Sequence, residues 1–140
     1  MADSRNKQEE LNQLAYLQNM YSREYEALTD QISNYLTLAN SFERNREVLT
    51  NMDKVQNSNM LVSLEAGMFA EVSAKKVTNV ITNVGAGYMI EKTIDEAKEF
   101  IGKNSERLNQ SVKKLMEQRQ RMEAQLLDLS YKINEMQQSQ

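Results

Sequence analysis

The sequence predicts an α+β fold in which a long antiparallel two-helix coiled coil is joined by two β-hairpins. Two observations predict it: apolar residues recur with coiled-coil spacing in both outer parts of the 140-residue chain, and the middle changes to the alternation of short strands. Because so short a segment separates the helices, the chain must fold back on itself. We therefore predict one structural unit, with helices over residues 1–56 and 93–140 and a double hairpin over residues 57–92.

The first helix is predicted from apolar residues that recur three and four positions apart, as a coiled-coil seam requires. The chain has no proline and only four glycines, so little in this segment would interrupt a helix. One extra step of four, from Tyr21 to Tyr25, is a stutter that locally relaxes the supercoil. The predicted seam comprises Leu14, Leu17, Tyr21, Tyr25, Leu28, Ile32, Tyr35, Ala39, Phe42, Arg46 and Leu49.

The middle segment alternates with period two, and its even-numbered positions are the apolar ones. This pattern predicts four short strands that form two hairpins. The predicted connections are Glu65-Ala66-Gly67 and Gly85-Ala86-Gly87, in which glycine supplies the positive φ of a tight loop. The predicted apolar face comprises Met60, Val62, Leu64, Met68, Ala70, Val72, Ala74, Val80, Val84, Tyr88 and Ile90.

The second helix is predicted to begin after Thr93, because Thr93 and Glu96 form a capping-box pattern. Its seam has a stutter from Leu108 to Val112, so we expect one continuous helix. At about 1.5 Å of rise per residue, a helix of about 45 to 50 residues is roughly 70 Å long. The predicted seam comprises Ile94, Ala97, Ile101, Asn104, Leu108, Val112, Leu115, Arg119, Met122, Leu126, Leu129, Ile133 and Met136.

Two isolated hairpins are marginally stable and leave strand edges whose backbone groups need partners. We therefore expect the hairpins to mediate oligomerisation, with subunits pairing edge to edge until a β-barrel closes. The residues predicted to serve subunit assembly are Val62, Leu64, Gly67, Val72, Val80, Val84, Gly85, Gly87, Tyr88 and Ile90.

Composition argues against several other functions. With no histidine and no cysteine, the chain offers neither a neutral-pH acid-base shuttle nor a thiolate metal site, so we expect no enzyme activity, cofactor or metal. Net charge is -3 and basic residues alternate with acidic ones, which argues against a nucleic-acid partner. No apolar run approaches the roughly 18 residues of a membrane span. The glycines near Gly85 are not a dinucleotide fingerprint, because Ile90 stands where the third glycine should be.

The double-hairpin segment resembles that of α-class prefoldin subunits. The resemblance is carried by MLVSLEAGMFAEVSAKKVTNVITNVGAGYMIEK, from Met60 to Lys92, and most specifically by NVGAGYMIEKTIDEAKEF, from Asn83. Ser63 and Glu65 depart from the usual pattern, which has proline and glycine there. Both archaeal α subunits and their eukaryotic counterparts match.

The resemblance implies a cytoplasmic, ATP-independent co-chaperone, or holdase. In this family two α-class subunits assemble with four β-class subunits into a hexamer. Its coiled-coil tips bind unfolded polypeptides and deliver them to a group II chaperonin. The chain would therefore have β-class subunits, unfolded polypeptides and the chaperonin as partners.

Four apolar residues near the free helix ends, Tyr16, Met20, Leu127 and Tyr131, lie off the seams. They can be ordinary irregularities of the pattern, or they can mark a tip that partly unzips to present apolar side chains to clients. On the second interpretation the client-binding residues, called the tip residues below, are Leu11, Leu14, Tyr16, Leu17, Leu126, Leu127, Leu129, Tyr131, Ile133 and Met136.

A different class of function stays open. The same sheet could assemble a coiled-coil scaffold or filament that binds no client. Suppression of the aggregation of a denatured protein, without ATP, would distinguish a holdase from such a scaffold.

Overall fold

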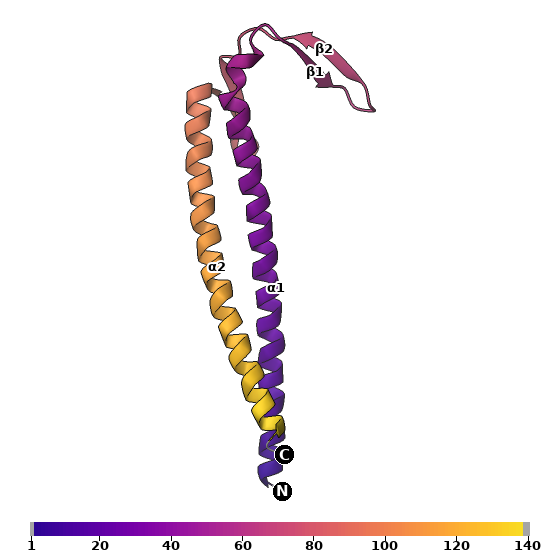
Figure 1. Cartoon of the computed structure of the whole chain (residues 1–140), viewed down its shortest axis with the longest axis vertical. Helices are drawn as coiled ribbons and strands as arrows, with labels where there is room; N and C mark the ends of the chain where they lie inside the picture. Colours follow the sequence, from indigo (N-terminus) through magenta and orange to yellow (C-terminus); the bar gives the residue numbers. More distant parts are fainter. Residues whose placement is uncertain (1, 139–140) are drawn as a thin grey trace. The chain divides into compact units, whose positions relative to one another are not determined.

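The computed structural model describes residues 2–138 and confirms the predicted fold class, two long helices joined by two small antiparallel hairpins (Figure 1). The elements in chain order are α1 (Ala2–Thr50), η1 (Met52–Val55), β1 (Asn59–Ser63), β2 (Phe69–Ser73), β3 (Asn79–Gly85), β4 (Tyr88–Thr93) and α2 (Ile94–Gln138). Helix α1 ends at Thr50, where the sequence predicted helix up to residue 56, and the short 3-10 helix η1 follows it.

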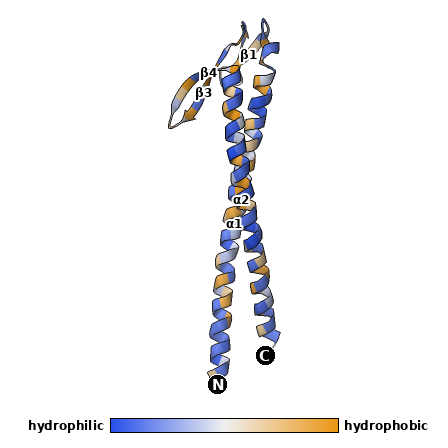
Figure 2. Cartoon of the chain, turned by 90° about the vertical axis from the view of Figure 1, so that its left-hand side faces the viewer, coloured by the Kyte–Doolittle hydropathy of each residue, from blue (hydrophilic) through white to orange (hydrophobic). Residues whose placement is uncertain are grey.

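The described residues fall into two compact units. Unit 1 comprises residues 2–37 of α1 and residues 108–138 of α2. Unit 2 comprises residues 38–107, which include both hairpins and the adjoining helix ends. Figure 2 shows apolar residues recurring along both helices among hydrophilic ones, as the predicted seams require.

Within unit 1 the two helices contact each other at Gln18 and Ser130. The Nε2 atom of Gln18 donates a hydrogen bond of 2.9 Å to Oγ of Ser130, across 112 positions of sequence. Because the chain runs in opposite directions along α1 and α2 (Figure 1), residues preceding Gln18 lie at the level of residues following Ser130. This contact defines the register of the pair.

The predicted seams are the buried stripes of both helices. Every predicted seam residue is buried or half-buried except Arg46. No polar or charged side chain is fully buried among the described residues, so the fully buried part of these seams is apolar. The buried residues are Ile32, Leu49, Ala97, Ile101, Leu108, Val112 and Leu129.

The predicted capping box begins helix α2. The backbone N–H of Glu96 donates to Oγ1 of Thr93 over 3.2 Å, and the N–H of Thr93 donates to Oε2 of Glu96 over 3.4 Å. These reciprocal bonds satisfy backbone donors that a helix N-terminus leaves unpaired. Strand β4 therefore becomes helix at the residue that the sequence indicated.

Hairpin 1, formed by β1 and β2, places its even-numbered residues on one face, as predicted. Met60 lies opposite Val72 and Val62 lies opposite Ala70, and opposite residues of an antiparallel pair project from the same face. This surface, called the even face of hairpin 1, comprises Met60, Val62, Leu64, Met68, Ala70 and Val72.

The turn of hairpin 2, formed by β3 and β4, differs from the predicted one. Strand β3 extends to Gly85, which pairs with Tyr88, so the connection contains the two residues Ala86 and Gly87 and not three. Both have positive φ, +51° and +80°, as two-residue type I′ turns require. The physical reason is a register shift between Asn83 and Gly85, a β-bulge that adds one residue to β3.

The two hairpins repeat one another. Residues 59–73 and 79–93 align without gaps, and asparagine, alanine, glycine and glutamate are identical at four positions. In both hairpins the first residue pairs with the last. In both, the asparagine Nδ2 donates to the glutamate Oε1, over 3.4 Å in hairpin 1 and 3.0 Å in hairpin 2. The chain therefore contains one hairpin design twice.

The repeat shows that Glu65 of hairpin 1 corresponds to Gly85 of hairpin 2. Glu65 has a φ of +71°, a left-handed conformation that is unfavourable for a residue with a side chain. The N–H of Met68 nevertheless donates to the carbonyl of Glu65 over 3.1 Å, so hairpin 1 closes through the equivalent turn.

Candidate functional site

All predicted tip residues lie in unit 1, near the first residues of α1 and the last residues of α2. Residues 11–17 directly precede Gln18, and residues 126–136 surround Ser130. Because Gln18 and Ser130 are hydrogen-bonded, both groups of tip residues lie at the same end of the pair. The structure thus brings them together from opposite ends of the sequence.

The tip residues differ in exposure. Tyr16 is 70% exposed, Leu127 74% and Tyr131 65%, so these three project away from the seam as their spacing indicated. By contrast, Leu129 is only 7% exposed, and the remaining tip residues are half-buried between the helices. A polypeptide can contact the first three directly, whereas the others become fully accessible only if the two helices separate.

A shallow hollow lies beside the first tip residues of α1. It has a volume of ≈ 440 Å³ and is lined by Asn12, Gln13, Tyr16 and Leu17. None of these side chains is charged. Its chemistry therefore suits apolar side chains and neutral hydrogen bonding, and offers no ionic partner.

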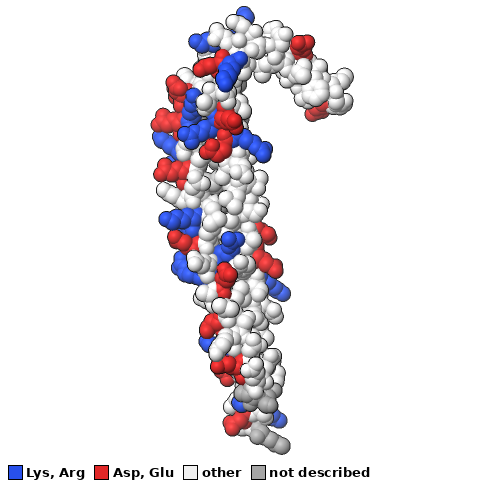
Figure 3. All heavy atoms as spheres, viewed as in Figure 1, with Lys and Arg blue, Asp and Glu red and all other residues white. Residues whose placement is uncertain are grey.

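Charged side chains of both signs are interspersed on the face shown in Figure 3. Two ion pairs link residues one helical turn apart on α2, Glu99 with Lys103 and Asp128 with Lys132, each at 3.2 Å. The acidic residue precedes the basic one, which is the favourable orientation along a helix. This arrangement is typical of a solvated helix surface rather than a phosphate-binding stripe.

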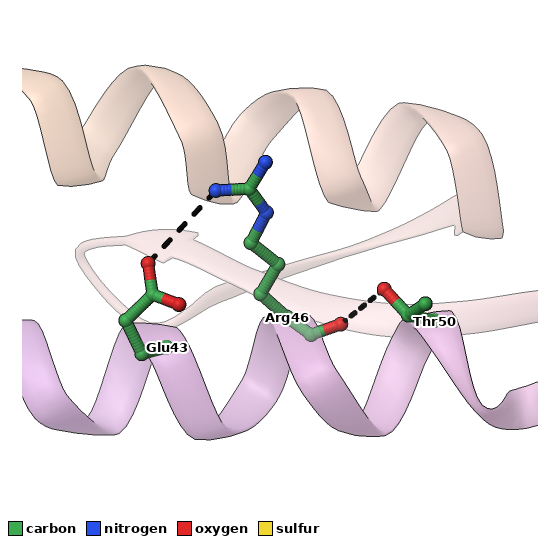
Figure 4. A network of polar contacts seen from close by, with 3 residues as sticks. All are labelled: Glu43, Arg46 and Thr50. Carbon is green, nitrogen blue, oxygen red and sulfur yellow. Dashed lines mark hydrogen bonds and ion pairs between the residues drawn. The ribbon is translucent and has the colours of Figure 1, made fainter.

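Arg46 is the one predicted seam residue that the structure exposes. Its side chain is 60% exposed, and one guanidinium nitrogen lies 3.9 Å from Oε1 of Glu43 (Figure 4). The Arg46 carbonyl accepts a hydrogen bond of 2.9 Å from Oγ1 of Thr50. The prediction was wrong here because a long charged side chain carries its head group to water wherever its stem lies.

The even face of hairpin 1 is apolar and uncovered. Exposure ranges from 40% at Val72 to 60% at Met68, and only Ala70 is half-buried. The face has no charged residue. Exposed apolar surface of this kind marks sites of association in soluble proteins.

Hairpin 2 packs on the helix ends of unit 2 at its base. Val80 contacts the buried cluster of Leu49, Ala97 and Ile101. Opposite Val80 on the next strand, Nζ of Lys92 lies 5.1 Å from the ring centroid of Phe100, a cation–π distance. The outer predicted assembly residues remain exposed, with Val84 at 37%, Tyr88 at 71% and Ile90 at 47%.

The second face of each hairpin was missed by the sequence reasoning. Leu61 is 69% and Phe69 62% exposed on hairpin 1, and Ile81 is 71% and Met89 59% exposed on hairpin 2. These are odd-numbered positions, which the alternation predicted to be polar. The signal that could have found them is the repeat itself, because the apolar pair recurs after 20 residues.

A second hollow of ≈ 370 Å³ lies in unit 2 between β3 and the adjoining helix ends. Apolar side chains from three elements line it, with Val48 of α1, Ile81 of β3 and Phe100 of α2 among them. This hollow depends on how the hairpin base packs on the helices, so no periodicity could have revealed it.

Two other kinds of site, a metal-binding cluster and a membrane-spanning helix, are absent from residues 2–138. No group of three or more histidine, cysteine, aspartate or glutamate side chains there could hold a metal ion. None of the helices in this range is both long enough and apolar enough to cross a membrane.

Comparisons with known proteins agree on one family. Residues 21–139 match the model of the family described as Prefoldin subunit. Prefoldin subunit alpha of Pyrococcus horikoshii is 30% identical over 134 residues, covering 94% of this chain and 90% of that protein. Human prefoldin subunit 5 is 27% identical over 106 residues, covering 75% and 69%. A filamentous PFD from Methanocaldococcus jannaschii, solved by cryo-EM, shares the fold with a TM-score of 0.56 and 19% identity, covering 92% and 99%.

Proposed function

Because this chain belongs to the prefoldin family as an α-class subunit, we propose that it is an ATP-independent holdase that binds unfolded polypeptides at its coiled-coil tips. It then delivers them to a group II chaperonin. In this proposal the protein is not an enzyme, works in the cytoplasm, and assembles as two copies with four β-class subunits.

The uncovered hairpin surfaces support the assembly part of the proposal. Hairpin 1 leaves a whole apolar face exposed, and the outer half of hairpin 2 leaves Tyr88 and Ile90 exposed. Each hairpin is also a two-stranded sheet with two unpaired edges. Strands from β-class subunits would pair with these edges, and closure into a barrel would bury the apolar faces.

The observation that carries the client-binding part is the exposure of Tyr16, Leu127 and Tyr131 at the free ends of one helix pair. Three large exposed apolar side chains offer contacts that do not depend on a particular client sequence. Each contact is weak. Several tips acting on one unfolded chain would retain it through their combined effective concentration.

The alternative is a scaffold or filament without clients. The same hairpin surfaces would serve it, and one structural relative of this fold is filamentous. Such a protein has no need of exposed apolar residues at the free helix ends, so the exposure of Tyr16, Leu127 and Tyr131 favours the holdase.

The test is to co-express the chain with a β-class prefoldin subunit, purify the complex, and mix it with a chemically denatured protein without ATP. We expect light scattering from the aggregating protein to fall as the complex approaches equimolar concentration. A complex of the expected mass that leaves aggregation unchanged would contradict the holdase and support the scaffold.

A further inference from the structure

We propose that Thr29 and Arg119, which lie at the same level of the coiled coil, form a layer that destabilises helix pairing. This layer, called the weak layer below, controls how readily the tip opens for clients. This inference rests on the proposed function, because it concerns the regulation of the same tip. It assigns a role to two residues that lie outside the tip and outside the hairpins.

The first observation is an unpartnered polar atom. Oγ1 of Thr29 is buried and has no hydrogen-bond partner among the described residues. A hydroxyl that leaves water without finding a partner destabilises the closed helix pair. Separating the helices would return this hydroxyl to water, so it favours opening.

The second observation concerns Arg119, which lies on α2 at the level of Thr29. Thr29 lies eleven residues after Gln18, and Arg119 lies eleven residues before Ser130, which is hydrogen-bonded to Gln18. Both intervals correspond to about 16 Å of helix rise. Arg119 is half-buried, and no ion pair accompanies it among residues 2–138. An arginine at this seam position buries less apolar surface than a leucine would, because its head group seeks water, and this also favours opening.

The position of this layer determines which part of the helix pair separates. On one side of it, within unit 1, the seam is closed by the buried residues Ile32, Leu108 and Val112. On the tip side, Leu129 is the one buried residue among those described. An unfavourable layer between a well-packed segment and a weakly packed one confines separation to the tip.

The consequence is quantitative. Where binding requires an open state that is rarely populated, the apparent affinity is the intrinsic affinity multiplied by the open fraction. A change at Thr29 or Arg119 that lowers the open fraction should therefore weaken by the same factor the part of client binding that uses the half-buried tip residues, whereas contacts with the exposed tip residues do not depend on opening. The change should also slow amide hydrogen exchange in the tip by that factor, because exchange there proceeds through the open state.

The test uses Thr29→Val, which removes the hydroxyl while nearly conserving volume, and Arg119→Leu, which removes the guanidinium. Both are measured in the complex with β-class subunits. We expect exchange in residues 2–28 and 120–138 to slow by about tenfold, and client affinity to weaken by up to the same factor through the half-buried tip residues. The matched control is Thr37→Val, because Thr37 is exposed and donates to the Ser33 carbonyl over 3.1 Å. It should change neither quantity.

Unchanged tip exchange in both variants would overturn the weak layer. Slower exchange with unchanged client affinity would overturn its link to clients while leaving the holdase intact. Failure of the wild-type complex to bind any client would instead contradict the proposed function, and the exchange comparison would still decide whether this layer governs opening.

Discussion

Replacing both Gly85 and Gly87 by valine should prevent subunit association while leaving the helices formed. Gly85 has a φ of +117° and Gly87 a φ of +80°, conformations that a β-branched residue adopts only with strain. A Cβ at either position would meet no atom within 4 Å, so the expected cost comes from backbone strain and not from a clash at Cβ. Strain of this kind costs about 1–3 kcal/mol per residue, or roughly 2–6 kcal/mol for the pair.

This strain energy exceeds the stability expected of a two-stranded hairpin. A two-stranded hairpin is marginally stable in water, and hairpin 2 is anchored on the helices chiefly at its base, by Val80 and Lys92. We therefore expect the turn to open and the strand register to be lost. The outer assembly residues, Val84, Tyr88 and Ile90, would then no longer be presented together.

The assay is size-exclusion chromatography with light scattering on the chain co-expressed with a β-class subunit, together with circular dichroism. We expect loss of the complex with little change in helical signal. The control is Gly102→Ala in α2, where a Cβ also meets no atom within 4 Å and φ is not positive. It should stabilise the helix by about 1 kcal/mol and preserve association. A wild-type complex mass for the double valine variant would refute the role of the sheet in assembly.

Three further substitutions test the local structure, each by the urea midpoint of the assembled protein. Glu65→Gly should stabilise hairpin 1 by roughly 0.5–1 kcal/mol, because it relieves a left-handed φ of +71°, and a lower midpoint would show that this turn carries no strain. Thr93→Ala should destabilise by about 1 kcal/mol through loss of the helix cap, and an unchanged midpoint would contradict the capping box. Arg46→Leu should change stability by less than about 0.5 kcal/mol because the side chain is exposed, whereas a gain above about 1 kcal/mol would show that position 46 lies in the seam.

The seams were predictable from sequence because burial in a coiled coil follows period alone. Leu49, Ala97 and Ile101, far apart in the chain, form one buried cluster at positions that the spacing indicated. Arg46 was mispredicted because a period assigns a position and says nothing of where a long side chain ends. The cap at Thr93 was predictable because its bonds join residues three positions apart.

The hairpins were predictable in part. Alternation located the strands and the even face, but the bulge before Gly85 shifted the turn by one residue, and no composition rule marks a bulge there. The exposed odd-numbered residues Leu61 and Ile81 contradict simple alternation. The packing of Val80 and Lys92 on the helix ends is a tertiary contact between segments, which no local pattern encodes.

The client-binding tip is tested most directly by replacing Tyr16, Leu127 and Tyr131 together with serine. All three are more than 60% exposed, so their loss should leave the seam and the assembly intact. The matched control replaces Leu36 and Met116 with serine in the same way. These residues are 44% and 40% exposed and lie in unit 1 away from the free ends. We predict that the triple variant keeps the mass of the complex with β-class subunits but loses most of its suppression of aggregation, while the control variant retains it. Full protection by the triple variant, at unchanged complex mass, would contradict client binding at the tip.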